Sequence, residues 1–316
     1  MVELASAQSA SQILFEGMGS MLPGWFLRHA LYLPIKTFNV VRAQRMLAYR
    51  QGWRLVREKA EAAKHGLELE DMYSVLLNSE ASKSRSLREE DIVAQTTLMT
   101  VGGQDTTSKT LCFGLIELAK NPQLQESLRA EIHAALGTDR ENIPYDSMPL
   151  LNAFIKELLR TYPVLPISDR MVLKDVVIPL SQSVATTTGQ RVNEIHVGNG
   201  ELVSLAIASH NRMGSRWGED ADKFRPSRWL DGTVYQGEAI GPYANLSVLT
   251  SSFHPCFTSP PYRRLSEMQV FLCELVGKFS FSLPADRSVK VKVAGTLLPT
   301  DAQGNKCAIL CVDRII

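Results

Sequence analysis

A carboxylate and a hydroxyl lie beside two adjacent glycines in a helix-like stretch, where together they could transfer protons. The residues are Gly102, Gly103, Asp105 and Thr106. Two glycines inside a helix cost roughly 1 kcal/mol each relative to alanine, and they favour a local opening of the backbone hydrogen bonds. A ligand or water could enter such a groove, where Asp105 and Thr106 would form a proton-relay pair. The alternative is a close helix–helix crossing, with Asp105 bonded to nearby backbone.

A second group of residues combines one glutamate with three arginines. Glu157 and Arg160 are three residues apart, so they share one face of a helix. Arg170 follows Pro166 at the start of a strand-like run, and Arg228 stands in a proline-centred turn next to aromatic residues. An exposed Glu–Arg pair contributes only a few tenths of a kcal/mol, so the pair alone indicates no function.

Mostly helical elements must position these groups. The second half of the longest predicted helix, 87–120, is apolar on nearly every side, which predicts burial all round. After Pro163, runs rich in Val and Ile predict strands, with Gly198-Asn199-Gly200 as a hairpin signal. This pattern predicts one mainly α domain with a small β component. The predicted helices are 38–65, 70–79, 87–120, 122–136, 150–162 and 264–279, and the predicted strands are 171–180, 194–207, 289–293 and 307–312.

Composition excludes several classes of protein. The 316 residues include 34 Lys and Arg against 33 Asp and Glu, a net charge of +1. This balance argues against a broad electrostatic attraction to nucleic acid or to an anionic membrane. No apolar run approaches the roughly 18–20 residues of a membrane-spanning helix. The odd count of 5 cysteines argues against a disulfide framework.

The order and spacing of these groups resemble the cytochrome P-450 family of heme-thiolate monooxygenases, and its fungal members most. A glycine-rich Asp–Thr helix is followed by Glu-x-x-Arg, then Pro-x-x-x-Arg, then Phe-x-Pro-x-Arg-Trp. The resemblance covers roughly residues 40–281 and implies the C-terminal three-fifths of a cytochrome P-450 fold. It implies an oxygen-activation helix at 86–120, the Glu-x-x-Arg helix at 150–162, a β region at 167–210, a meander at 211–246, a heme-ligand loop at 247–263 and a final helix at 264–280.

The resemblance implies roles for the residues that match the motifs. Asp105 and Thr106 match the acid and alcohol that deliver protons during oxygen activation, and Gly102 and Gly103 match the groove beside the cofactor. Arg170 matches the position that pairs with a heme propionate, a contact that suits a guanidinium.

The resemblance also implies a structural core and a set of partners. Glu157 and Arg160 match a buried ion pair that a third residue, here Arg228, completes. The family implies heme b (iron-protoporphyrin IX), electrons from NADPH through an NADPH-cytochrome reductase, and a small organic substrate oxidised in fungal secondary metabolism. No nucleic-acid partner is expected.

The start of the chain departs from the family. Full-length fungal members begin with a membrane anchor and further helices, so the resemblance implies an N-terminal truncation. It also implies that full-length relatives are located in the endoplasmic reticulum membrane and that this chain is intracellular, in the cytoplasm. Membrane association would then depend on the missing N-terminus or on residues 22–33; the alternative for 22–33 is packing onto the long helix.

The iron-ligand loop departs further. The family pattern is Phe-x-x-Gly-x-Arg-x-Cys-x-Gly, but 247–262 lacks its glycines and its arginine, and three prolines surround the one cysteine, Cys256. In the family pattern a glutamate follows the cysteine by nine residues. Nine residues before Glu267 stands Thr258, so Cys256 is displaced from the expected position by two. Cys256 is the provisional axial ligand of the heme iron. His254 is the competing ligand, and Cys273 is expected in the hydrophobic core.

Three hypotheses of different classes follow. The first is a heme-dependent monooxygenase that inserts one oxygen atom into a C–H bond. The second is a catalytically inactive, truncated remnant of the family that keeps the core of Glu157, Arg160 and Arg228 but binds no heme. The third is an unrelated helical scaffold, in which the order of the motifs is accidental.

Overall fold

The computed structural model describes residues 32, 36–65, 89–97, 103–136, 143–232, 262–285, 289–294, 296–301, 304 and 310–315. These residues belong to two units. One comprises Met1–Lys109 with Pro299–Cys307, and the other Thr110–Leu298 with Ala308–Ile316. Each unit is described by itself, and the single-domain prediction stays a prediction.

The first unit contains two packed helices, α4 (Lys36–Lys64) and α7 (Glu89–Thr97). Val56 of α4 is buried together with Ile92 and Val93 of α7, and the half-buried Trp53 packs against them. The predicted helix 38–65 is therefore confirmed to within two residues. The predicted helix 70–79 lies outside the described residues.

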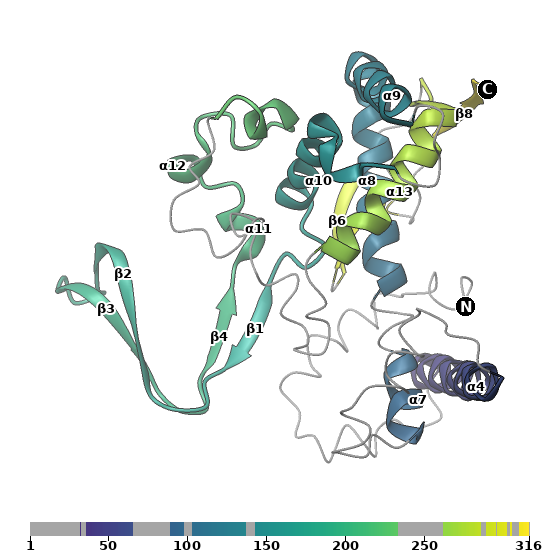
Figure 1. The fold of residues 1–316 in the computed structure, drawn as a ribbon. Helices are drawn as coiled ribbons and strands as arrows, with labels where there is room; N and C mark the ends of the chain where they lie inside the picture. Colours follow the sequence, from purple (N-terminus) through teal and green to yellow (C-terminus); the bar gives the residue numbers. More distant parts are fainter. Residues whose placement is uncertain are drawn as a thin grey trace. The chain divides into compact units, whose positions relative to one another are not determined.

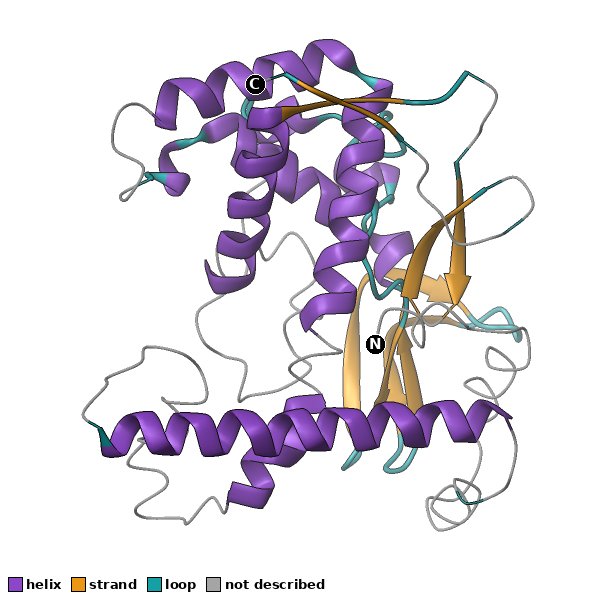
Figure 2. Cartoon of the chain, turned by 90° about the vertical axis from the view of Figure 1, so that its right-hand side faces the viewer, coloured by secondary structure: helices purple, strands orange, loops and turns teal. Residues whose placement is uncertain are grey.

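Among the described residues of the second unit, four helices have more than one turn, and Figures 1 and 2 show their course. Because proline has a fixed φ and needs no N–H partner in the first turn, Pro122 and Pro149 each open a helix, as predicted within one residue. The predicted helix 87–120 corresponds to α7 and α8, and residues 98–102 between them are outside the described residues. The helices are α8 (Gly103–Lys120), whose first seven residues belong to the first unit, α9 (Pro122–Leu136), α10 (Pro149–Thr161) and α13 (Tyr262–Lys278).

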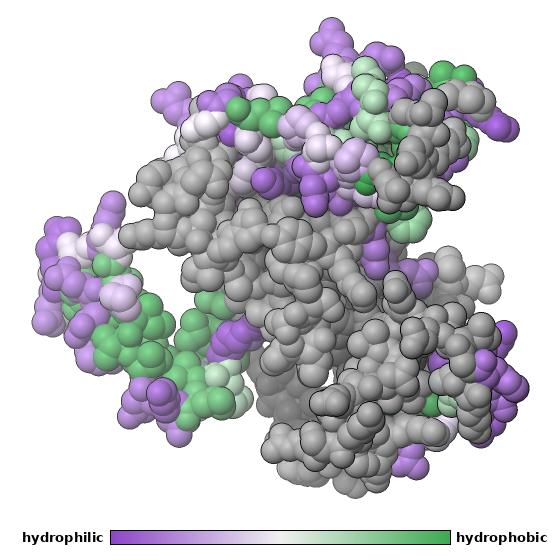
Figure 3. Space-filling model, viewed as in Figure 1, coloured by the Kyte–Doolittle hydropathy of each residue, from purple (hydrophilic) through white to green (hydrophobic). Residues whose placement is uncertain are grey.

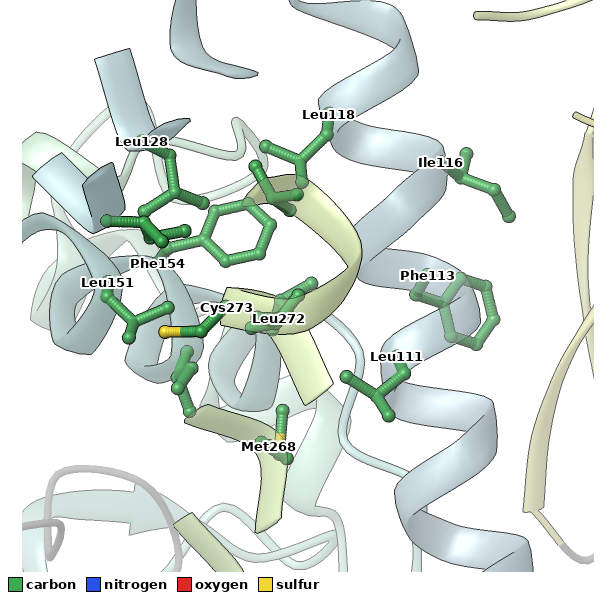
Figure 4. Packing of buried hydrophobic residues seen from close by; sticks show 14 of the residues in the cluster. Leu111, Phe113, Ile116, Leu118, Leu128, Leu151, Phe154, Met268, Leu272 and Cys273 are labelled. Atoms are coloured by element: carbon green, nitrogen blue, oxygen red, sulfur yellow. The ribbon is translucent and has the colours of Figure 1, made fainter. Parts of the chain in front are cut away.

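The hydrophobic core of the second unit lies among these four helices (Figure 4). The second half of α8 is buried nearly all round, as predicted. Gly114 permits a close approach to α10, because a Cβ there would lie 2.9 Å from Leu158 Cδ1. Cys273 is buried in this core, which confirms its predicted place. The largest fully buried apolar side chains among the described residues are Phe113, Ile116, Leu118, Leu128, Ile132, Met148, Leu151, Phe154, Ile155 and Leu158.

Side chains of α9 hold the end of α13 and the strand that follows it. Arg129 donates from Nε to the carbonyl of Val276 over 3.0 Å and from Nη2 to that of Phe279 over 3.0 Å. The carbonyls at a helix C-terminus have no partners within the helix, so a guanidinium there satisfies them and favours the helix dipole. This clamp joins two helices that are more than 100 residues apart in the sequence.

A long two-stranded antiparallel ribbon follows α10 (Figure 1). Its half next to the helices pairs β1 (Ser168–Met171) with β4 (Leu202–Leu205), and its outer half pairs β2 (Val176–Ala185) with β3 (Arg191–Val197). Apolar side chains gather along the ribbon in the space-filling view (Figure 3). The exposed ones include Met171, Leu173, Ile178, Ile195 and Leu202.

The predicted hairpin at Gly198–Gly200 is wrong. The reversal lies at Thr186–Gln190, where the amide of Thr186 donates to the carbonyl of Gln190 over 2.8 Å and Gly189 has a φ of +82°. The 198–200 segment instead bends the returning strand, since the amide of Gly200 donates across to Val172 over 2.8 Å. The predicted strands 171–180 and 194–207 are each divided at this bend.

The remaining elements are short. The described part of the predicted meander, 211–232, contains one single-turn helix at Gly214–Trp217 and a 3-10 turn around Pro226, while residues 233–246 lie outside the described residues. The mainly α fold class with a small β component is confirmed. None of the described helices is long and apolar enough to cross a membrane. The short elements are η2 (Tyr145–Ser147), α11 (Ile207–His210), α12 (Gly214–Trp217), η3 (Pro226–Trp229), β5 (Phe279–Ser282), β6 (Lys290–Ala294), β7 (Thr296–Thr300) and β8 (Cys311–Arg314).

Candidate functional site

The site centres on the carboxylate of Glu157, which is fully buried together with Arg160 and Arg228. Arg160, one helical turn further along α10, donates from Nε to Oε2 over 2.9 Å and from Nη2 to Oε1 over 2.8 Å. Arg228, on η3, donates from Nε to Oε1 over 2.9 Å. The spacing of Glu157 and Arg160 explains the two-pronged contact, because residues i and i+3 are neighbours on a helix.

Two further donors complete the shell of the carboxylate. The backbone amide of Arg225 donates to Oε1 over 2.8 Å, and the indole Nε1 of Trp229 donates to Oε2 over 2.9 Å. A buried charge requires such bonds, because leaving it unpaired costs several kcal/mol. The carboxylate of Glu157 therefore binds both ends of the turn that holds Arg228.

The remaining guanidinium N–H groups of Arg160 bind backbone carbonyls of the meander. Nη1 donates to the carbonyls of Asn211 and Ala221 over 2.7 and 2.6 Å, and Nη2 donates to that of Lys223 over 2.9 Å. The second arginine behaves alike: Arg228 Nη1 donates to the carbonyl of Trp217 over 3.2 Å. The meander backbone from 211 to 223 is thus folded around two buried arginines, beside a small hydrophobic cluster of Trp217 and Ala221.

Asp220 adds a second carboxylate at the rim of the cluster. Its Oδ1 accepts from Arg228 Nη1 over 3.1 Å, and its Oδ2 lies 2.7 Å from Arg225 Nε. Burial raises the pKa of Asp220, but the bonds and charges of Arg228 and Arg225 outweigh it and hold the pKa below its ordinary value. Asp220 therefore stays ionised, and its negative charge balances the positive charge of Arg228.

Tryptophan rings cover the cluster. The guanidinium carbon of Arg160 lies 5.3 Å from the ring centroid of Trp217, and the rings of Trp217 and Trp229 are 5.6 Å apart. Lys156 Nζ lies 5.8 Å from the ring centroid of Trp229. Such cation–π contacts are favourable where water is excluded. Sequence reasoning assigned no role to Trp217, Asp220 or the Arg225 amide, although Trp229 stood in a recognised motif.

Arg170 lies on β1, opposite Val203 of β4. Its Nη1 donates to Ser168 Oγ over 2.6 Å and to the carbonyl of Asp169 over 2.9 Å. The side chain is half-buried, and a guanidinium in this setting suits a carboxylate ligand. Arg170 thus offers the donor chemistry that a heme propionate needs.

Asp105 and Thr106 lie in the first turns of α8 and belong to the first unit. The carboxylate of Asp105 forms an ion pair with Lys109, one turn along the helix, and Thr106 Oγ1 donates to the carbonyl of Gly103 over 3.4 Å. A negative charge in the first turn also favours the helix dipole. Gly103 opens α8, and Gly102 lies outside the described residues.

The provisional metal ligand, Cys256, also lies outside the described residues, together with His254 and the whole segment 247–261. Among the described residues, no group of three or more His, Cys, Asp or Glu could hold a metal ion. The structure therefore brings together Glu157, Arg160 and Arg228. It leaves Cys256, Gly102 and the proton-relay roles as predictions.

Comparison with known proteins identifies the family of the chain. The family model of cytochrome P-450 matches residues 2–246, so the chain belongs to the cytochrome P-450 family. The match ends just before the predicted ligand loop at 247–263.

Fungal relatives place the chain more closely within the family. Cytochrome P-450 monooxygenase 91 of Postia placenta is 34% identical over 83% of this chain and 51% of its own length. Ganoderic acid synthetase of Ganoderma lucidum is 31% identical over 84% of this chain and 52% of its own length. Cytochrome P-450 monooxygenase claO of Ampulloclitocybe clavipes is 30% identical over 75% of this chain and 45% of its own length. The chain is thus of the fungal type and spans about half the length of these relatives.

Proposed function

We propose that the chain is the heme-binding part of a monooxygenase that oxidises a small organic molecule in fungal secondary metabolism. The observation that carries the proposal is the buried cluster of Glu157, Arg160 and Arg228, which holds the meander. Arg160 of this cluster stands ten residues before Arg170 of β1. The names of the relatives support the reaction class, and one of them is a ganoderic acid synthetase.

Different residues of this chain would bind the cofactor, transfer protons and supply the iron ligand. Heme b, when bound, supplies oxygen activation at its iron. Arg170 would bind a propionate and orient the ring, while Asp105 and Thr106 would hold protons and pass them toward the reacting oxygen. Cys256 would supply the thiolate, a role that rests on the resemblance alone. NADPH would supply electrons through a reductase partner.

A second candidate function rests on a specific observation. The family match ends at residue 246, and the following segment lacks the glycines and the arginine of the ligand loop. A remnant that keeps the buried cluster without binding heme is the alternative. Binding of hemin to the purified chain separates the two proposals.

Replacement of Arg170 by alanine tests the heme-binding role. Because a charge-assisted hydrogen bond contributes about 1.5–3 kcal/mol, we expect hemin to bind about tenfold or more weakly to Arg170→Ala. Titration followed by Soret absorbance measures the change. Arg191→Ala is the matched control, since Arg191 is an exposed arginine of the same ribbon that donates to Ser183 over 3.0 Å. Equal affinities for the two variants would contradict the assignment.

Replacement of Thr106 by alanine tests the proton-relay role. We expect the yield of product per NADPH consumed to fall about tenfold, because positioned acid–base groups contribute at least this much. The measurement compares oxygen uptake, NADPH consumption and product in the presence of a reductase. Thr107→Ala, one residue along the same helix, is the control. Unchanged coupling in Thr106→Ala would count against the role.

A further inference from the structure

The connector between α10 and β1 is held at several points by partners far away in the sequence. Just before it, the carbonyl of Thr161, the last residue of α10, accepts from Arg212 Nη2 over 2.8 Å. The carbonyl of Val164 accepts from the amide of Leu297 over 2.9 Å, and that of Pro166 accepts from the amide of Ala208 over 3.0 Å. A connector tied in this way cannot shift without breaking bonds at several points. It leads directly into β1, the strand of Arg170.

The side chain of Tyr162 joins this connector to α8. Its hydroxyl donates to Glu117 Oε1 over 2.6 Å, and its ring stacks on Phe113 with centroids 4.4 Å apart and planes 6° from parallel. Phe113 and Glu117 are one turn apart on α8, so one helix face holds both the ring and the hydroxyl. Glu117 also accepts from Lys120 Nζ over 2.7 Å.

The phenol acts here as a fixed donor. Burial raises the pKa of Tyr162, and the hydrogen bond to Glu117 and its charge raise that pKa further. The hydroxyl therefore stays protonated over the whole working range of pH. A bond to a buried carboxylate is also stronger than one between neutral groups.

We propose that Tyr162 is a positioning residue, which fixes the connector against α8 and thereby sets the place of Arg170 for its anionic ligand. The ligand part of this inference rests on the proposed function, in which Arg170 binds a heme propionate. The mechanical part rests only on the bonds of Tyr162. The two parts call for separate measurements.

Amide hydrogen exchange in Tyr162→Phe tests the mechanical part. Phenylalanine keeps the ring on Phe113 and removes only the donor, so we expect exchange about tenfold faster in residues 163–171 and unchanged exchange in α10. Tyr145→Phe is the control, since the described residues offer no hydrogen-bond partner to the Tyr145 hydroxyl. Unchanged exchange in the connector would overturn the proposal. So would equal acceleration throughout α8, α10 and α13, which indicates general destabilisation.

A double-mutant cycle with hemin tests the ligand part. Tyr162→Phe should weaken hemin binding several-fold in the wild-type background and have no further effect in Arg170→Ala, because it acts through that arginine. The same loss in both backgrounds would overturn the positioning role. If the wild-type chain binds no hemin, the proposed function and the ligand part fail together, whereas the exchange experiment still decides the mechanical part.

Discussion

Replacement of Glu157 by alanine is expected to lower the free energy of unfolding by about 3–5 kcal/mol. The substitution leaves Arg160 and Arg228 buried side by side without their shared carboxylate. It also removes the acceptor of the Arg225 amide and of the Trp229 indole. Since a domain has only about 5–15 kcal/mol of stability, most of it would be lost. Urea denaturation, followed by circular dichroism and tryptophan fluorescence, measures the change.

Two further variants make this prediction robust. Glu126→Ala removes a carboxylate that also pairs with an arginine, Arg129, but its side chain is 71% exposed. It should therefore cost less than about 1 kcal/mol. Trp229→Phe removes a single donor to Glu157, so we expect the free energy of unfolding to fall by about 1.5–3 kcal/mol. This milder variant tests the cluster if Glu157→Ala does not fold. If Glu157→Ala lowers the free energy of unfolding no more than Glu126→Ala does, the cluster does not stabilise the fold as described.

Replacement of Cys256 by serine is expected to abolish the thiolate signature of bound hemin. Burial, with the charges of Glu274 and Glu131, raises the pKa of Cys273 to about 12, so that thiol stays protonated. Burial also raises the pKa of Cys112. Neither thiol is therefore suited to replace Cys256 as an anionic ligand. The absorption spectrum of the hemin complex checks this expectation.

Cys311→Ser is the matched control for Cys256→Ser. Cys311 lies on β8, where its side chain is exposed, so the substitution disturbs no core packing. The spectrum of its hemin complex should equal that of the wild type. A thiolate spectrum that survives in Cys256→Ser would show that another residue holds the iron.

The sequence predicts most of the helical frame, because prolines mark the start of two helices and apolar runs mark the buried ones. Pro122 and Pro149 are N-terminal residues of α9 and α10, and the nearly continuous apolar run of α8 requires burial. The ribbon was predicted less well. Gly198-Asn199-Gly200 carries a hairpin signal, yet tertiary pairing with Val172 makes it a bend, and the true reversal at Thr186–Gln190 has a weaker signal.

The site was predictable only in part, for a related reason. Glu157 and Arg160 are visible as a spacing, and Arg228 as part of a motif, but a spacing does not reveal burial. The shell around them depends on backbone groups such as the Arg225 amide and the Asn211 carbonyl. Every residue has a backbone carbonyl, so the residue types do not predict which backbone groups bind the cluster. Only the folded meander shows which ones the arginines bind.

Absorption spectroscopy of the wild-type chain after hemin reconstitution tests the proposed function most directly. The proposal predicts a Soret band that moves, when the complex is reduced in the presence of carbon monoxide, to the long wavelength from which the family takes its name. Cys256→Ser should lose that band while keeping the far-ultraviolet circular dichroism of the wild type. A folded wild-type chain that shows no Soret band, or one without this shift, would contradict the monooxygenase proposal and favour the heme-free remnant.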